Sequence, residues 1–485
     1  MHYYSTRNKN EPFSFAQAAL GGLAPDGGLF IPETIPPYRE TVKHCLGSMS
    51  FLETACETIG PYTKDEIPAQ VLEEICAGAF SFNAPLVPAG RGSMASPLGD
   101  TQASSLEDSR ASGAPFPLML ELFHGPTAAF KDFGARFMAR TFSWLRRGED
   151  QPLHILVATS GDTGGAVADG FFGVEGISVT VLYPKGRVSE LQEKQIAGLG
   201  GTISALAVEG SFDDCQALVK GAFGDAALRE KLALSSANSI NISRLIPQAV
   251  YYAAAAGKVM EGRWDPDGEA TPVSAKVGTQ KKAPVTAPDR HFKGGPVSFC
   301  VPSGNFGNLT AGLYARAMGA PIAGFIAATN INKTVPDYLE NGEYKTRLSQ
   351  ATISNAMDVG APSNFERMAA HWTYGEMQRM IRGISVTDDE TRKTISDVYQ
   401  ECGYYLDPHG AVGWTALQKL TASAGITGPT AVLATAHPAK FAETVEALTG
   451  PVPIPLSIQK ALGRKAQSKT IPADLAALRD VLLNG

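Results

Sequence analysis

One unit recurs along this chain and constrains its fold more than any other feature: an apolar, β-branched run, then a loop rich in glycine or small polar residues, then an amphipathic helix. Its apolar runs span 153–158, 177–183, 202–208, 297–301, 322–328 and 430–433. Near-continuous apolar strands that alternate with helices are typical of parallel sheets with helices on both faces, so we predict an α/β fold. In such folds ligands bind beyond the carboxyl ends of the strands. We therefore expect the loops of these units to share one site.

The 485 residues are enough for two or three domains with a large buried core. Apolar residues at helical spacing predict a mostly helical region over residues 1–95. We expect the segments that follow to be the start of the core at 96–150, a smaller α/β domain at 151–262, a surface insertion at 263–296 and a larger α/β domain at 297–485.

Two segments differ in composition from the rest of the chain. Pro, Gly, Ser, Ala and Asp dominate residues 88–116, and residues 263–296 contain Asp265-Pro-Asp-Gly268 and a basic pair at Lys281 and Lys282. Such segments bury too little apolar surface to fold alone. We predict an exposed loop for the first and a solvated insertion for the second.

The bulk composition excludes several classes of protein. The net charge of −6 gives no reason to expect a nucleic-acid or anionic-membrane partner. No apolar run approaches the roughly 20 residues that a membrane helix needs. The residues after Met1 lack the apolar core of a secretory signal, so we expect a cytoplasmic protein. Six dispersed cysteines without a Cys-x-x-Cys pair indicate reduced thiols and no metal site.

The stretch from Glu121 to Arg136 carries the most reactive candidate side chain. It passes through a Gly-Pro turn into a helix that is predicted to start near Thr127, with Lys131 between two phenylalanines. Apolar neighbours disfavour the charged amine and lower its pKa, and a neutral amine can form a Schiff base. The alternative is a surface lysine whose stem covers apolar neighbours while its ammonium reaches water.

The loop Pro302-Ser-Gly-Asn-Phe-Gly-Asn308 follows one apolar strand and opens a predicted helix at 309–318. Its glycines let backbone N–H groups surround an anion, and the helix N-terminus adds partial positive charge. The loop lacks both the P-loop pattern and the Gly-x-Gly-x-x-Gly pattern of dinucleotide sites. It is either a phosphate cradle or a tight turn that requires glycine.

A second loop of this kind is Ser160-Gly-Asp-Thr-Gly-Gly165. Backbone donors and the hydroxyls of Ser160 and Thr163 suit a carboxylate ligand, and Asp162 can accept from a hydroxyl or an ammonium group. Alternatively, Ser160 or Asp162 caps the helix that follows.

Isolated polar residues follow other strands. Lys185, Arg187 and Arg244 could each bind a phosphate, although isolated cations usually lie at the surface. Thr435 ends the last strand, where its hydroxyl could bond a ring nitrogen or cap a helix. An imine-forming lysine, an anion cradle and a carboxylate loop together suggest pyridoxal phosphate as cofactor, because it supplies an aldehyde and a phosphate.

The same motifs resemble those of the threonine synthase family, in the branch found in fungi and many bacteria. The resemblance rests on Leu122–Gly134, Ser160–Gly164, Pro302–Asn308, Ala356–Arg367, Asp407–Gly410 and Thr435–Phe441, and on an N-terminus similar to the family's. It covers nearly the whole chain outside 88–116 and 263–296. It implies the fold of the tryptophan-synthase-β-like, fold-type II enzymes, with two open, mainly parallel twisted sheets flanked by helices.

The resemblance also implies roles for single residues. Lys131 would form the Schiff base with pyridoxal phosphate and carry protons once released. The cofactor phosphate would be held by Gly304, Asn305, Phe306 and Asn308, with Thr435 at the pyridine nitrogen. The substrate α-carboxylate and the ring edge of the cofactor would be bound by Ser160, Gly161, Asp162 and Thr163. Candidates for the substrate phosphate are Lys185, Asn241 and Arg244.

The implied reaction converts O-phospho-L-homoserine and water to L-threonine and phosphate, in a monomer or a homodimer. One alternative is a phospholyase or a threonine dehydratase of the same superfamily, and a dehydratase would not need a phosphate clamp. The other is a catalytically silent protein that binds pyridoxal phosphate. An intact Lys131 and both loops argue against the silent protein.

Overall fold

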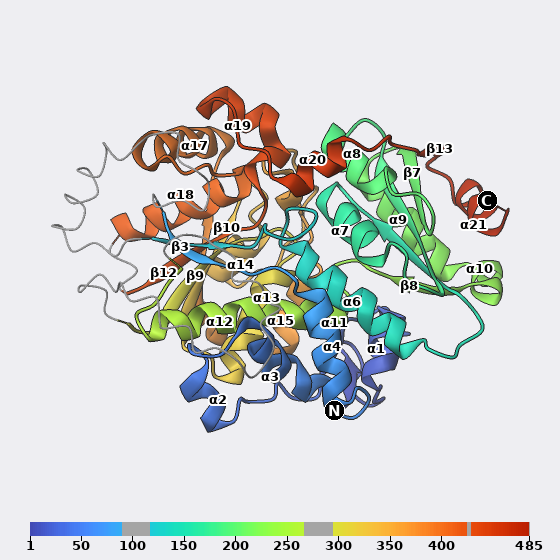
Figure 1. Ribbon diagram of the computed structural model, residues 1–485, viewed down its shortest axis with the longest axis horizontal. Coiled ribbons are helices and arrows are strands. Elements are labelled where there is room, and N and C mark those ends of the chain that lie inside the picture. The colour runs from blue at the N-terminus through green and yellow to red at the C-terminus, as the bar shows by residue number, and fades with distance from the viewer. Residues whose placement is uncertain (90–116, 266–293, 424–427, 485) are drawn as a thin grey trace.

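The computed structural model of the protein describes residues 1–89, 117–265, 294–423 and 428–484 (Figure 1). It contains one six-stranded sheet, one five-stranded sheet and a two-stranded ribbon among these residues. The α/β class and the two mainly parallel sheets expected from the sequence are confirmed. Most of the exposed loop expected at 88–116, and most of the insertion expected at 263–296, lies outside the described residues.

The larger sheet has the strand order β11-β10-β9-β12-β4-β3. All of its neighbouring strands are parallel except β3 and β4. Its strands are β3 (Leu86–Pro88), β4 (Leu118–Glu121), β9 (Val297–Pro302), β10 (Ile322–Thr329), β11 (Ile381–Ser385) and β12 (Thr430–Ala434). The runs predicted at 297–301, 322–328 and 430–433 are therefore strands of one sheet.

Helices cover both faces of the larger sheet (Figure 1). On one face lie α3 (Phe51–Thr63), α12 (Ala249–Met260) and α13 (Gly307–Met318); on the other lie α17 (Asp388–Cys402), α18 (Pro408–Ala422) and α19 (Ala442–Thr449). Strand β9 shows why its sequence is apolar throughout. Phe299 and Val301 are buried in one hydrophobic core, and Cys300, between them, is buried in the other, because alternate side chains of a strand face opposite sides.

The smaller sheet has the order β13-β7-β6-β5-β8, and all of its pairs are parallel. Its strands are β5 (Leu153–Ala158), β6 (Ile177–Pro184), β7 (Ile203–Glu209), β8 (Ala233–Ser236) and β13 (Lys469–Pro472). The helices around it are α6 (Lys131–Leu145), α7 (Asp162–Phe171), α8 (Glu190–Ala197), α9 (Phe212–Gly224), α10 (Ala226–Lys231) and α21 (Leu475–Asn484). The expected range 297–485 thus contributes its last strand to the sheet that range 151–262 builds.

The N-terminal region is mostly helical, as predicted, and it docks on both sheets' domains. It comprises β1 (Tyr3–Ser5), α1 (Phe15–Gly21), β2 (Phe30–Pro32), α2 (Glu40–Cys45), α3 and α4 (Ala69–Ala79), with β1 and β2 antiparallel. The fully buried Arg367 donates to the carbonyls of Phe30 and Ile240 at 2.9 and 2.8 Å. Arg7 pairs with Glu366 at 2.9 Å. These contacts fix the N-terminal region beside the loops at the carboxyl ends of the strands.

Short helices complete the described chain: α11 (Ile242–Leu245), η2 (Ile246–Gln248), α14 (Thr334–Asn341), η3 (Asn355–Met357), α15 (Asn364–His371), α16 (Tyr374–Met380), η4 (Pro438–Phe441) and α20 (Leu456–Leu462). Among the described residues, no helix has both the length and the apolar character that a membrane span requires.

Candidate active site

Lys131 lies where the two sheets' domains meet, at the first position of α6. The chain leaves β4 and β12, which are neighbouring parallel strands, at the same edge of the larger sheet. There the N–H of Phe130 donates to the carbonyl of Thr435 at 2.9 Å, and Ala129 bridges to Ala436. The turn that carries Lys131 is therefore fixed to the end of β12.

The helix predicted to start near Thr127 starts four residues later. The carboxylate of Asp132 accepts from the backbone N–H of Thr127 at 2.9 Å and from its hydroxyl at 2.6 Å. Ala128 has a φ of 55°, a left-handed conformation that a helix does not tolerate. The side chain of Asp132 thus holds a turn in place of the expected first helical turn.

The amine of Lys131 is removed from water. Its side chain is only 15% exposed, and Nζ lies 3.8 Å from Oδ2 of Asp162 and 5.6 Å from the ring centre of Phe130. Burial lowers the pKa of Lys131; Asp162 opposes this, and the charges of Lys440 and Arg244 lower the pKa further. The surface-lysine alternative therefore does not describe this side chain.

Lys440, from η4, was not among the residues expected from the sequence. Its side chain is fully buried, and its Nζ lies 3.1 Å from Oδ1 of Asp162. The same ammonium donates to the carbonyl of Thr127 at 2.7 Å and to Oε1 of Gln195 at 2.8 Å. One side chain thus joins the loop after β12, the Lys131 turn, α7 and α8. Its position in the same loop as Thr435 is the sequence signal that could have found it.

The loop 160–165 presents a carboxylate that stays ionised. Burial favours protonation of Asp162, but the charges of Lys440 and Lys131 outweigh it and hold its pKa well below the usual range. The amide of Gln192 adds a hydrogen bond of 3.0 Å. Two buried cations therefore share one buried anion.

The backbone of this loop requires glycine at 161. Gly161 has a φ of 141°, and a Cβ there would lie 2.5 Å from the amide of Gln192. The hydroxyl of Thr159 accepts from the N–H groups of Gly161 and Gly164, at 2.9 Å each. The N-cap of α7 is Gly161, and the hydroxyl of Thr159 binds the N–H of Gly164 in its first turn, so helix capping does not explain Ser160 or Asp162.

The backbone of the loop 302–308, the predicted anion cradle, is tightly constrained. A Cβ at Gly304 would lie 2.8 Å from the carbonyl oxygen of Ala356, and Phe306 has a φ of 59°. Helix α13 begins at Gly307, so its first N–H groups have no intrahelical acceptor. The left-handed conformation of Phe306 is strained for a residue other than glycine.

The two asparagines of this cradle differ. Oδ1 of Asn308 accepts from Tyr251 and Tyr252 at 2.6 and 2.7 Å, while its buried Nδ2 has no partner among the described residues. Asn305 uses both side-chain atoms: its Nδ2 donates to Ser239 at 2.6 Å, and its Oδ1 accepts from the N–H of Ser363 at 2.6 Å. Asn308 therefore has a side-chain donor available for a ligand, whereas only the backbone of Asn305 is available.

The three residues predicted to bind the substrate phosphate, Lys185, Asn241 and Arg244, lie in different environments. Arg244 is buried beside Lys131; burial lowers its pKa to about 10, which Asp132 opposes. Its Nη1 donates to the carbonyl of Ala237 at 2.6 Å, and its buried Nε has no partner among the described residues. Within the described parts of the chain this buried guanidinium has an unused donor and no ion pair with a carboxylate, which fits an anionic ligand.

Asn241 and Lys185 already have hydrogen-bond or ion-pair partners in the protein. Asn241 is fully buried; its amide donates to the carbonyls of Ala19 and Ser236, and its Oδ1 caps α11 by accepting from Ser243. The side chain of Lys185 is 53% exposed, and its ammonium pairs with Glu209 at 3.0 Å. The structure does not bring either side chain into the Lys131 cluster.

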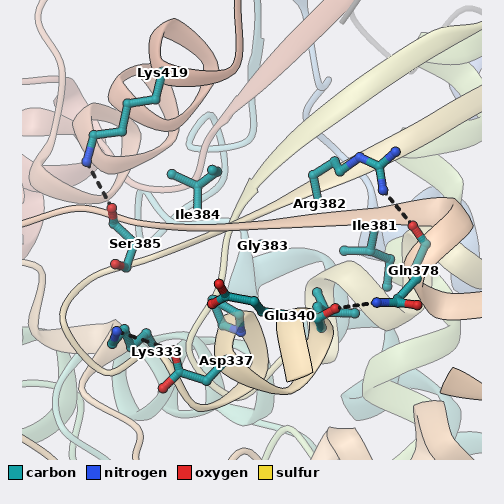
Figure 2. Close-up of a pocket in the computed structure, with 12 residues that line it drawn as sticks. Lys333, Asp337, Glu340, Gln378, Ile381, Arg382, Gly383, Ile384, Ser385 and Lys419 are labelled. Atoms are coloured by element: carbon teal, nitrogen blue, oxygen red, sulfur yellow. Dashed lines mark hydrogen bonds and ion pairs between the residues drawn. The ribbon is translucent and has the colours of Figure 1, made fainter. Parts of the chain in front are cut away.

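Another cavity lies at β11, the edge strand of the larger sheet, and Figure 2 shows its lining. It has a volume of about 610 Å³ and is lined by residues of α14, α16, α18 and β11. Two of its three cations have ion-pair partners: Lys333 lies 3.3 Å from Asp337, and Lys419 lies 2.8 Å from Glu390. The third, Arg382, donates to the carbonyl of Gln378 at 2.8 Å. This cavity does not include Lys131 or either glycine loop.

Comparison with known proteins agrees with this site. Residues 95–259 match the model of pyridoxal-phosphate-dependent enzymes, residues 2–80 that of the threonine synthase N terminus and residues 410–482 that of the threonine synthase C-terminal region. The fold and the site thus define a pyridoxal-phosphate-dependent enzyme.

Whole-chain relatives are more specific. Threonine synthase of Escherichia coli (strain K12) is 40% identical, with 100% of both chains covered, and that of Saccharomyces cerevisiae is 33% identical over 92% of this chain and 89% of its own. The chain belongs to the threonine synthase family. The crystal structure of the Escherichia coli enzyme superposes with a TM-score of 0.80 at 37% identity over 100% of both chains.

Two further solved structures show how far the similarity extends. The structure of threonine synthase from Brucella melitensis with bound pyridoxal phosphate has a TM-score of 0.80 at 34% identity, covering 99% of this chain and 98% of its own. A tomato threonine deaminase has a TM-score of 0.52 at 15% identity over 78% of this chain and 87% of its own. The deaminase shares the fold alone.

Proposed function

We propose that the protein converts O-phospho-L-homoserine and water to L-threonine and phosphate, using pyridoxal phosphate bound through Lys131. The observation that carries this proposal is the buried amine of Lys131, whose pKa is lowered and which lies 3.8 Å from Asp162 of the loop 160–165. The nearby Arg244 adds a buried Nε without a partner among the described residues. Membership of the threonine synthase family supports the reaction. The bound cofactor supplies an aldehyde for the amine and an electron sink for charge that develops at the substrate Cα.

The residues around Lys131 fit this cofactor. We propose that the phosphate lies against the N–H groups of Gly304, Asn305 and Phe306 and at Nδ2 of Asn308, the buried donor without a partner. An anion at a helix N-terminus is stabilised by these N–H groups and by the helix dipole. Thr435, whose carbonyl holds the Lys131 turn, would present its hydroxyl to the pyridine nitrogen.

For the substrate carboxylate we propose the backbone of Gly161 and the hydroxyls of Ser160 and Thr163. Asp162 is negatively charged in this environment, so it would not bind a carboxylate itself. We propose instead that it accepts a hydrogen bond from the ring edge of the cofactor or from an amine. Two cations neutralise it, which allows an anionic substrate to approach.

The three candidates for the substrate phosphate do not have equal support. Arg244 has an unused donor beside Lys131, and cationic groups at a departing phosphate stabilise the charge that it gains. Lys185 and Asn241 remain candidates from the sequence alone, because their side chains are engaged elsewhere. We therefore assign the substrate phosphate to Arg244.

Lys131 has a second task after the substrate amine displaces it. Burial lowers the pKa of this amine and so favours its neutral form, which can take a proton from the substrate Cα and return it later. Asp162, 3.8 Å away, stabilises the protonated amine between these two steps. The same buried environment thus serves both imine formation and proton transfer.

Product analysis separates this reaction from its alternatives. Purified protein with pyridoxal phosphate and O-phospho-L-homoserine is expected to release phosphate and L-threonine in equal amounts. Phosphate with 2-oxobutanoate would identify a phospholyase, and turnover of threonine or serine without phosphate release would identify a dehydratase. Cofactor binding without turnover of any of these compounds would identify a silent binding protein.

We also propose a cytoplasmic enzyme that is a monomer or a homodimer and has no nucleic-acid or membrane partner. The net charge of −6 supports the absence of these partners. We propose the following division of the chain. Residues 1–95 form a mostly helical N-terminal region, and residues 96–150 form the start of the core with the cofactor lysine. The substrate-carboxylate domain at 151–262 is separated from the cofactor-phosphate domain at 297–485 by the insertion at 263–296. Light scattering of the purified protein tests the oligomeric state.

A further inference from the structure

A cavity between α4, α6 and α7 is separate from the site around Lys131. Its volume of about 840 Å³ lies in the range of roughly 300–1,000 Å³ that small-molecule sites have. The described residues that line it include three arginines, three carboxylates and several apolar side chains, but neither Lys131 nor a residue of the loops 160–165 and 302–308. This lining offers both signs of charge and an apolar surface to one ligand.

Arg140 of α6 has a half-buried guanidinium without an anionic partner. Its one hydrogen bond joins Nη1 to the carbonyl of Arg136 at 3.5 Å, and within the described ranges of the chain it forms no ion pair. Burial and the charge of Arg136, one turn earlier, both lower the pKa of Arg140, which Asp169 opposes. A guanidinium presents a fork of N–H donors that matches the two oxygens of a carboxylate. Arg140 is therefore suited to a ligand's carboxylate.

Asp169 of α7 is the complementary group in this cavity. Its side chain is 22% exposed, and its ion pair with Nη1 of Arg136 spans 3.6 Å, which is longer than a hydrogen bond. Over the residues that the structure describes, its carboxylate accepts no hydrogen bond. Burial raises the pKa of Asp169, although the charges of Arg136, Arg464 and Arg140 oppose this. A partly buried carboxylate without donors is stabilised by an ammonium group from a ligand.

The apolar part of the lining includes an aromatic ring that the fold leaves uncovered. Phe172, which follows α7, is 49% exposed. Val71 and Ile75 of α4 and Val174 also line the cavity. An exposed apolar surface in a concave site is stabilised when a ligand covers it. The cavity therefore fits a ligand with an apolar group beside its charges.

The remaining charges of the lining decide between a zwitterion and a phosphate. Glu74 and Glu175 add two exposed carboxylates. Arg147 is already engaged, since its guanidinium lies 3.2 Å from the ring centre of Trp144 and its Nη1 donates to the carbonyl of the same residue at 2.8 Å. Three carboxylates balance the three arginines, so a phosphate, with about two negative charges, is repelled more than a ligand of zero net charge.

We propose that this cavity binds a free α-amino acid with an apolar side chain. The guanidinium of Arg140 donates to the α-carboxylate, the carboxylate of Asp169 accepts from the α-ammonium group, and Phe172 covers the side chain. The ligand thereby contacts the two helices that carry Lys131 and Asp162 in their first turns. The inference does not depend on the proposed function, because none of its binding residues takes part in that reaction.

Analogues of one probe, L-leucine, test the charge pattern in the unaltered holoenzyme. 4-Methylpentanoate lacks the ammonium group and 3-methylbutylamine lacks the carboxylate, while both keep the apolar chain. Calorimetry is expected to show binding of L-leucine and at least about tenfold weaker binding of each analogue, because each lacks one charge-assisted hydrogen bond. Equal affinity of either analogue, or no binding of L-leucine, would overturn the proposal.

Variants of the two charged residues locate the binding. Arg140→Gln and Asp169→Leu are each expected to weaken L-leucine binding at least about tenfold and to keep phosphate release within about twofold of the unaltered protein. The matched control is Arg146→Gln, since Arg146 ends the same helix but does not line the cavity. We expect this control to keep the full affinity. Unchanged affinity in Arg140→Gln, or an equal loss in the control, would refute the site.

The visible absorbance of the bound cofactor separates this cavity from the site of Lys131. Saturation with L-leucine is expected to leave the absorbance unchanged. An absorbance change with the same concentration dependence as the calorimetric binding, retained in Arg140→Gln, would place the probe beside Lys131 and overturn the proposal. If the unaltered protein releases no phosphate from O-phospho-L-homoserine, the proposed function fails, whereas the binding of L-leucine still decides the second site.

Discussion

Nζ of Lys440 lies 3.1 Å from Oδ1 of Asp162, and both side chains are almost completely buried. The other carboxylate oxygen of Asp162 lies 3.8 Å from Nζ of Lys131. One anion therefore sets the charge of the reactive lysine while a second lysine, fixed by two further hydrogen bonds, holds that anion in place. Asp162 and Lys440 are more than 270 positions apart in the sequence. Four mutational predictions concern these and neighbouring residues of the site.

Replacement of Lys440 by Met is expected to destabilise the protein. The substitution leaves Asp162 buried with one distant cation, and removal of one partner of a buried pair typically costs about 3–5 kcal/mol. Urea unfolding followed by circular dichroism measures the change. The double variant Lys440→Met with Asp162→Asn is expected to recover part of the loss, because no unpaired carboxylate remains. Additive losses would contradict the pairing.

Replacement of Lys131 by Ala is expected to abolish the visible absorbance of the bound cofactor and to lower kcat/KM by more than about 10³-fold, because the imine-forming group and the Cα base are lost together. The matched variant Lys131→Arg keeps a cation beside Asp162 without a group that forms an imine. It should lose absorbance and turnover equally while keeping more of the stability. Normal turnover in either variant would disprove the assignment of Lys131.

Replacement of Arg244 by Ala is expected to raise KM for the phosphorylated substrate by roughly 10-fold to 100-fold, since a hydrogen bond to a charged group contributes about 1.5–3 kcal/mol. Steady-state kinetics of phosphate release measures the effect. Arg39→Ala, at a side chain that is 72% exposed, serves as the control and should behave like the unaltered protein. An unchanged KM in Arg244→Ala would exclude this arginine from phosphate binding.

Asp132 makes stability depend on pH in a defined window. Burial raises its pKa to about 6, although Thr127 donates to it. The folded state therefore binds this proton more tightly than the unfolded state, whose carboxyl has a pKa of about 3.9. Between these values the folded state holds more protons, so the free energy of unfolding falls as pH rises from about 4 to about 6, by up to about 3 kcal/mol.

Asp132→Asn tests this dependence because its side chain does not titrate. Urea unfolding at several pH values should show a smaller decline between pH 4 and 6 in the variant than in the unaltered protein. Asp358, whose pKa burial also raises to about 6, is expected to supply a remaining decline of the same sign. Identical pH profiles of the two proteins would show that Asp132 does not titrate in this range.

Several of the strongest features could be predicted from the sequence because they are local. The six apolar runs became strands with bounds within one or two residues, since continuous burial on both faces demands an unbroken apolar sequence. The glycine loops could also be recognised from the sequence, at 160–165 and 302–308, because their backbone restricts the residue type locally. Lys131 could be recognised from the two phenylalanines beside it in the sequence. A glycine with positive φ, or one against a neighbouring backbone, constrains its own residue type.

Other features depended on residues that are distant in the sequence. Strands β8 and β13 have four residues each and exposed or half-buried ends, so their apolar signal is short. The start of α6 is set by the carboxylate of Asp132, which accepts hydrogen bonds from Thr127 and overrides the helical pattern. Asn241 has a side chain that could bind a ligand, but its amide already donates hydrogen bonds to the carbonyls of Ala19 and Ser236.

The sequence by itself determined the alternation of strands and helices, the two glycine loops and the lysine that chemistry requires. Only the tertiary structure decided which charges meet. Lys440 comes from the segment after β12, and its importance follows from burial against Asp162, which no local pattern encodes. The physical reason is that a buried charge is defined by its partners, and folding alone brings partners together from opposite ends of the chain.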